Sequence, residues 1–219
     1  MPSPTLLLAS NSPRRKQLLV LGGWEFTTAP ADVDESVLPG ESPREYVMRL
    51  AEAKARASAE QAEAGQVVVG SDTTVVIDGD ILGKPADSAE AESMLRRLRG
   101  RTHQVYTGIA VFNVADGRLS SDLCITDVPM RDYGDGEIRA YVATGDPLDK
   151  AGAYAIQHPG FQPVARMEGC FSSVMGLPHC HLARLLKEFG LTPGADLPGN
   201  CQAFLKYQCP VFPSILGTG

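Results

Sequence analysis

The sequence predicts an α/β protein, and three observations support that fold class. Short apolar runs typical of buried strands alternate with segments that carry helix-start signals along most of the chain. Hydrophobic residues make up 43% of the 219 positions and charged residues 21%, so a sizeable core can form. The length fits one large domain or two tightly fused lobes better than domains joined by linkers.

The first part of the chain contains two helices with clear start signals. We expect residues 5–9 to form a buried strand, because nearly all of them are apolar. Directly after it, Ser12 followed by Pro13 predicts a helix with Ser as N-cap and Pro in its first turn. The Ser-Pro-Arg-Glu segment at 42–45 is a capping box and predicts a second, alanine-rich helix that continues to about Glu63.

The middle of the chain predicts further strands and helices in alternation. Residues 67–70 read as a strand buried on both faces, and residues 75–77 as a strand that enters a tight turn. A third helix, capped by Asp87 or Ser88, is expected to end at Gly100. The later elements are two long strands at 103–112 and 121–130 and two helices at 135–143 and 178–189.

The composition changes at Thr192. Four Pro, four Gly and two Cys occur among the last 28 residues, without a clear periodicity. We therefore divide the chain into a domain at 1–191 and an extension at 192–219 that is draped on the domain. A zinc or oligomerisation element that includes His179, Cys180 and His181 is the alternative, although the spacing supports a metal site only weakly.

Composition and charge narrow the class of function. The formal charge of −6 argues against binding a nucleic acid over a broad surface, but it leaves room for a small anionic ligand in one pocket. The apolar run at 6–9 is too short for a signal peptide, and no run approaches the length of a membrane span. Five irregularly spaced cysteines fit reduced thiols better than a disulfide framework. We expect a cytoplasmic protein without a membrane partner.

A basic segment lies at the first strand-to-helix junction. Free N–H groups at a helix N-terminus favour an anion, and Ser10 and Ser12 lie just before this one. The same turn contains three cations, at Arg14, Arg15 and Lys16, although positive charge at a helix N-terminus opposes the helix dipole. Their placement is explained if phosphate charge is normally present. A solvated basic turn is the alternative.

Further charged residues could complete a phosphate site. Lys54 falls on the apolar stripe of the second helix, where its ammonium must either reach solvent or serve a function. Asp72 follows a buried strand, Lys84 lies a short distance beyond, and the acidic segment 32–35 ends in Glu35. Two carboxylates beside several cations describe a magnesium-dependent phosphate site, whereas the alternative is a pair of surface salt bridges. Walker and G-x-G-x-x-G patterns are absent from the sequence.

Four sequence blocks stand out by their order and spacing. They read LASNSPRR at 8–15, GSDT at 70–73 with GKP at 83–85, DKAGAYAIQ at 149–157, and SVMGLP at 173–178. In these blocks the chain resembles the Maf family of nucleoside triphosphate pyrophosphatases over about residues 5–190. The resemblance implies an elongated α/β fold like that of inosine triphosphate pyrophosphatases, with a long mixed sheet, a cleft between two lobes, and often a homodimer.

The resemblance also implies roles for individual residues. Asp72 matches the proton acceptor of the family and, with Glu35, the positions that hold a divalent cation, Mg²⁺ or Mn²⁺. Ser10, Arg15, Lys54 and Lys84 match positions that handle phosphate and metal, and of these Lys54 and Lys84 are expected to be catalytic together with Asp72. The positions that sort substrates are matched by Arg14, Thr73 and Gln157. This chain departs from the family's pattern in the His-Pro pair at 158–159 and in the Gly-Cys-Phe segment at 169–171. Both departures concern the local shape of the loops beside the base.

The implied reaction is hydrolysis of dTTP and UTP to the nucleoside monophosphate and pyrophosphate. Modified pyrimidine nucleoside triphosphates are expected as further substrates. Their removal would prevent misincorporation into nucleic acid. A sister group that prefers 7-methyl-GTP has Trp, Gln and Glu where this chain has Arg14, Thr73 and Gln157. A 7-methyl-GTP pyrophosphatase is therefore one alternative, and a nucleotide-binding regulator of septum formation with weak turnover is another. Because every block lies upstream of residue 191, we expect the extension to be dispensable for activity.

Overall fold

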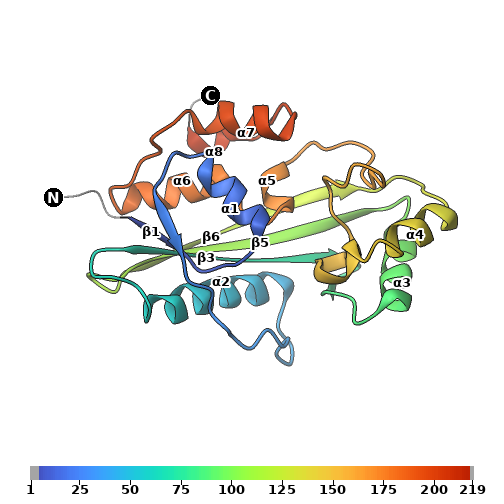
Figure 1. The fold of residues 1–219 in the computed structure, drawn as a ribbon, viewed down its shortest axis with the longest axis horizontal. Helices are drawn as coiled ribbons and strands as arrows, with labels where there is room; N and C mark the ends of the chain where they lie inside the picture. The colour runs from blue at the N-terminus through green and yellow to red at the C-terminus, as the bar shows by residue number, and fades with distance from the viewer. Residues whose placement is uncertain (1–4, 218–219) are drawn as a thin grey trace.

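The computed structural model describes residues 5–217, which form one long, twisted mixed sheet with helices on both faces (Figure 1). The strand order is β2-β1-β3-β5-β6, with the short β4 paired to β3. Strand β1 runs parallel to β2 and β3, and the other pairs are antiparallel. The strands are β1 (Leu6–Leu8), β2 (Phe26–Thr28), β3 (Val67–Ile77), β4 (Asp80–Leu82), β5 (Thr102–Asn113) and β6 (Leu119–Pro129). This sheet confirms the predicted fold class.

The helices form layers on the two faces of the sheet and at its far end (Figure 1). Helix α2 covers one face, and α1, α5 and α6 cover the other, with α7 and α8 outside them; α3 and α4 pack at the far end of the long strands. Their bounds are α1 (Pro13–Val20), α2 (Pro43–Ala59), α3 (Ser88–Leu98), α4 (Asp135–Val142), α5 (Phe171–Val174), α6 (His179–Glu188), α7 (Leu197–Leu205) and α8 (Phe212–Leu216). Two short 3₁₀ helices, η1 (Asp146–Asp149) and η2 (Ala151–Ala153), follow α4.

The predicted caps begin the helices. The Ser12 hydroxyl accepts a hydrogen bond from the Arg15 amide at 3.4 Å, and Ser42 and Glu45 form the predicted capping box. The α2 helix ends at Ala59, four residues earlier than predicted. No helix within residues 5–217 is both long and apolar enough to cross a membrane.

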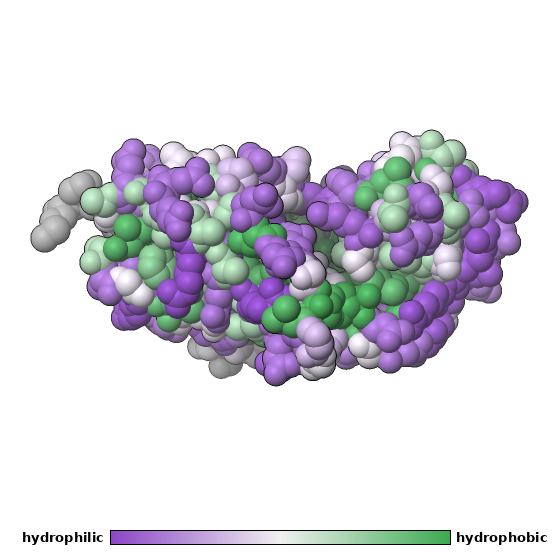
Figure 2. Space-filling view, turned by 90° about the horizontal axis from the view of Figure 1, so that it is seen from below, coloured by the Kyte–Doolittle hydropathy of each residue, from purple (hydrophilic) through white to green (hydrophobic). Residues whose placement is uncertain are grey.

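Three hydrophobic clusters divide the core into two lobes. One cluster lies at the α3 and α4 end around Val75, Leu95 and Tyr133. A second joins the sheet to α1 and α6, and a third lies beneath α2. The surface is hollowed between the two lobes (Figure 2).

The prediction of two separate strands at 67–70 and 75–77 was wrong, because β3 runs without a break from Val67 to Ile77. Every residue from Val67 to Val76 pairs with a residue of the long strand β5, and this pairing continues the ladder through the polar segment 71–74. Asp72 therefore lies in the middle of a strand and not beyond the end of one.

Two glycines allow α2 to lie close against the sheet. A Cβ atom on Gly70 would lie 2.2 Å from the carbonyl oxygen of Ala51, and one on Gly108 would lie 2.5 Å from that of Val47. Real Cβ contacts do not reach such distances. The close approach brings Lys54 of α2 to within hydrogen-bond distance of β3.

We predict that Gly70→Ala lowers the free energy of unfolding by roughly 1–3 kcal/mol, because the added methyl group pushes α2 away from the sheet. Urea unfolding measures the effect. Gly136→Ala in α4 is the matched control, since its Cβ would meet no atom within 4 Å, and we expect it to stay within about 0.5 kcal/mol of the parent protein. Equal stabilities of the two variants would contradict the close seating of α2.

Candidate active site

A cavity of about 620 Å³ lies between the two lobes. It forms beside β3 where that strand lacks a neighbour on one edge. Strand β1 pairs with residues 67–69 of β3 and β4 pairs with residues 75–77, so in the described chain residues 70–74 have a partner strand, β5, on one side only. Side chains from both faces of β3 can reach the gap.

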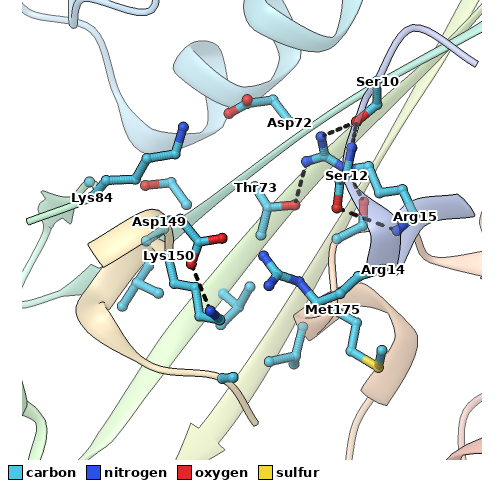
Figure 3. A pocket seen from close by; sticks show the side chains of 18 of the residues that line it. Ser10, Ser12, Arg14, Arg15, Asp72, Thr73, Lys84, Asp149, Lys150 and Met175 are labelled. Atoms are coloured by element: carbon cyan, nitrogen blue, oxygen red, sulfur yellow. Dashed lines mark hydrogen bonds and ion pairs between the residues drawn. The ribbon is translucent and has the colours of Figure 1, made fainter. Parts of the chain in front are cut away.

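All the site residues expected from the sequence line this one cavity. They are Ser10, Arg14, Arg15, Glu35, Lys54, Asp72, Thr73, Lys84 and Gln157. Figure 3 shows Arg14 and Lys84 reaching toward the cavity from opposite sides, with Asp72 and Thr73 on the strand between them. The structure thus brings together groups separated by up to about 150 positions in the sequence.

The Arg15 guanidinium is fixed by neutral acceptors. Its Nε donates to the Gly176 carbonyl at 2.9 Å, and its two terminal nitrogens donate to the hydroxyls of Ser10 at 3.3 Å and Thr73 at 3.4 Å. Burial lowers the pKa of Arg15, and the charge of Asp72 partly opposes that change. An arginine nonetheless keeps its proton. Because its direct partners carry no negative charge, this cation remains available to an anionic ligand.

The Lys54 ammonium bridges two carboxylates. Its Nζ lies 2.7 Å from Oδ1 of Asp72 and 2.5 Å from Oε1 of Glu35. Lys54 and Asp72 are only 8% and 7% exposed. Lys54 therefore does not extend its ammonium into solvent. Of the two possibilities that the sequence left open, a functional role for this lysine is favoured.

The electrostatic environment keeps Glu35 ionised and Tyr46 protonated. Partial burial acts to raise the pKa of Glu35, but the hydrogen bond and charge of Lys54 outweigh it, so the pKa is lowered. Burial, together with the negative charges of Asp72 and Glu35, raises the pKa of Tyr46 to about 12. The Tyr46 hydroxyl donates to the Glu35 carbonyl oxygen at 3.0 Å and holds the acidic loop against α2.

The cavity carries an excess of positive charge. Five cationic side chains line it against three carboxylates, in a chain whose formal charge is −6. The five are Arg14, Arg15, Lys54, Lys84 and Lys150, and the carboxylates are Glu35, Asp72 and Asp149. Cations gathered against the sign of the whole chain mark a site for an anion.

Sequence reasoning missed several residues that build the site. Lys150 lines the cavity and donates to Asp149 at 2.6 Å and to Asp146 at 3.0 Å, but the sequence alone assigns it no role. The Gly176 carbonyl was missed as well. Gly176 has a φ of +104°, and a Cβ there would lie 3.2 Å from Nε of Arg15. A Met-Gly pair followed by Leu-Pro carried no signal for this contact.

The metal alternative at His179, Cys180 and His181 is not supported. His179 is buried, with its Nε2 against the Leu18 carbonyl oxygen, and burial lowers the pKa of its ring to about 4. His181 is paired with Asp122 at 2.9 Å. Residues 5–217 contain no group of three or more His, Cys, Asp or Glu side chains placed to hold a metal ion.

The fold and the cavity define an α/β protein with an anion site between two lobes. Residues 5–189 match the family model described as Maf-like protein, and the chain belongs to the Maf family. A protein of Geobacter sp. (strain M21) called dTTP/UTP pyrophosphatase is 46% identical over 190 residues, which cover 87% of this chain and 98% of that protein. One of the same name from Anaeromyxobacter dehalogenans (strain 2CP-C) is 48% identical over 190 residues, covering 86% and 95%.

Among solved structures, the Staphylococcus aureus Ham1 protein matches with a TM-score of 0.46 and 16% identity, over 74% of this chain and 81% of that one. The family match ends before Thr192, so the C-terminal extension lies outside it.

Proposed function

We propose that this chain hydrolyses dTTP and UTP to the nucleoside monophosphate and pyrophosphate. One observation carries the proposal: two groups line the same cavity. The first is the buried Asp72 carboxylate, which is paired with Lys54, and the second is the Arg15 guanidinium, which is fixed by neutral partners. Relatives at 46% and 48% identity bear the name of this activity. Cleavage of a phosphoanhydride depends mainly on positioning and on stabilising charge, which these groups can supply.

Asp72 is proposed as the base that activates water. Among the described residues only its Oδ1 is hydrogen-bonded, so Oδ2 can accept a proton from a water molecule. Lys54 holds this carboxylate in place, with its Nζ 2.7 Å from Oδ1 of Asp72. Attack on the α-phosphorus expels pyrophosphate, and Arg15, Lys84 and Ser10 are proposed to neutralise and bind its growing negative charge.

A divalent cation fits the donor set. Magnesium prefers oxygen ligands and is commonly bound by one or two carboxylates together with substrate phosphates and water. Glu35 and Asp72 supply two carboxylates that lie close together, because both contact the ammonium of Lys54. We propose that they hold Mg²⁺ or Mn²⁺. When bound, the cation shields the charge of the triphosphate.

Substrate choice is proposed to depend on Arg14, Thr73 and Gln157. Gln157 is exposed at the cavity, where its neutral amide can pair with the O4 and N3–H edge of uracil or thymine. The guanidinium of Arg14 repels the positive charge of a 7-methylated guanine. These features favour dTTP and UTP, with 5-substituted uridine triphosphates, over 7-methyl-GTP. The cytoplasmic homodimer expected from the sequence stays a prediction.

The test is a nucleotide panel with product analysis. With Mg²⁺ or Mn²⁺ we expect dTTP and UTP to give monophosphate and pyrophosphate, with little turnover of ATP, GTP or 7-methyl-GTP and none without metal. A preference for 7-methyl-GTP would contradict the proposed specificity. Binding of dTTP without any product would favour the nucleotide-binding regulator instead.

A second prediction concerns Asp72. Asp72→Asn keeps the size of the side chain but removes the base, so kcat should fall by about 10²-fold or more with the circular dichroism spectrum unchanged. Asp80→Asn is the control. Asp80 is an exposed residue of β4 that pairs with Arg97 and does not line the cavity. Full activity of Asp72→Asn would refute the assignment of the base.

A further inference from the structure

The C-terminal extension contacts the turn that follows α1, the helix that carries Arg15. The Gly194 amide donates to the Gly22 carbonyl at 2.9 Å. Two side chains add hydrogen bonds in opposite directions: Asn200 donates to the Leu21 carbonyl at 3.1 Å, and Trp24 donates to the Thr192 carbonyl at 3.1 Å. The extension is therefore anchored to the C-terminal end of α1.

The same extension also contacts α5 and the residues just before it. The Tyr207 hydroxyl donates to the Gly169 carbonyl at 2.9 Å, and its ring packs against Phe171, the first residue of α5, with ring centroids 5.7 Å apart. Tyr207 thus holds the segment that leads into α5.

The other end of α5 holds Arg15. The Gly176 carbonyl, two residues after α5, accepts the hydrogen bond from Nε of Arg15. The Ser173 carbonyl accepts from the Thr107 hydroxyl at 2.9 Å, and Thr107 is hydrogen-bonded at 3.0 Å to Thr73, which in turn accepts from Arg15. Both routes from α5 end at the same guanidinium.

The junction between extension and domain also has an apolar part. Cys170 and Cys180 of the domain line a small cavity together with Cys201 and Cys209 of the extension, and Leu197 is only 2% exposed. Leu205 packs against the core cluster beneath α1 and α6. Burial of this apolar surface favours a docked extension.

We infer that the extension is a clamp that positions Arg15, because it joins α1, which carries Arg15, to α5, whose following carbonyl fixes the guanidinium. Tyr207 is its positioning residue. This inference rests on the proposed function only in that Arg15 binds phosphate. It differs from the expectation that the extension is dispensable, which follows from the position of the four sequence blocks and stays a prediction.

Calorimetric titration with inorganic pyrophosphate in the presence of Mg²⁺, well below the unfolding temperature, tests the clamp in the full-length chain. We expect Tyr207→Ala to weaken binding about tenfold, the size expected when one charge-assisted hydrogen bond is misaligned. Tyr207→Phe keeps the ring and should lose less. Phe204→Ala, at an exposed aromatic residue of α7 (44% exposed), is the matched control and should bind like the parent protein.

A double-mutant cycle separates positioning from general stabilisation. In an Arg15→Ala background, Tyr207→Ala should have no further effect on pyrophosphate affinity, because the residue it positions is gone. Additive losses, or unchanged affinity of folded Tyr207→Ala, would overturn the clamp. If Tyr207→Ala does not fold, the same cycle with Tyr207→Phe decides. A parent protein that does not bind pyrophosphate would contradict the proposed function itself.

Discussion

The positive charge of Lys54 lies inside the apolar face of α2, and the cavity depends on how this charge is compensated. A buried ammonium without a partner is costly, and removal of one partner from a buried ion pair costs about 3–5 kcal/mol. Lys54 finds Asp72 on β3 and Glu35 on the loop before α2. The contact requires α2 to lie close to the sheet, which Gly70 and Gly108 allow. Glycines in the sheet thus determine where a charged cluster can form.

The gap in the sheet determines what that cluster can reach. Because neither β1 nor β4 covers residues 70–74 of β3, the carboxylate of Asp72 and the hydroxyl of Thr73 meet the same space although they project from opposite faces. Arg15 enters from the start of α1 and Lys84 from beyond β4. The excess of cations is balanced when a polyphosphate binds. The ligand then relieves the mutual repulsion among the cations. This favours binding of the most highly charged form of the polyphosphate.

The sequence was sufficient for features that depend on local chemistry. Ser12 and Ser42 cap helices as predicted, and the long strands β5 and β6 lie within two residues of the ranges predicted for them. The position of Lys54 on an apolar stripe signalled a constrained lysine. Other features depend on distant partners: the placement of Asp72 in mid-strand follows from pairing with β5, and the Gly176 contact joins residues 161 positions apart. The helices of the extension likewise depend on tertiary packing, since their own sequence has no clear periodicity.

We propose that water, activated at Asp72, attacks the α-phosphorus while pyrophosphate leaves among the cations. Hydrolysis of dTTP in water enriched in oxygen-18 tests it most directly, because mass spectrometry of the products locates the new oxygen. We expect one labelled oxygen in the nucleoside monophosphate and none in pyrophosphate. Label in pyrophosphate would mean attack at the β-phosphorus, and release of orthophosphate with a nucleoside diphosphate would mean a different cleavage. Either result would contradict attack of water on the α-phosphorus.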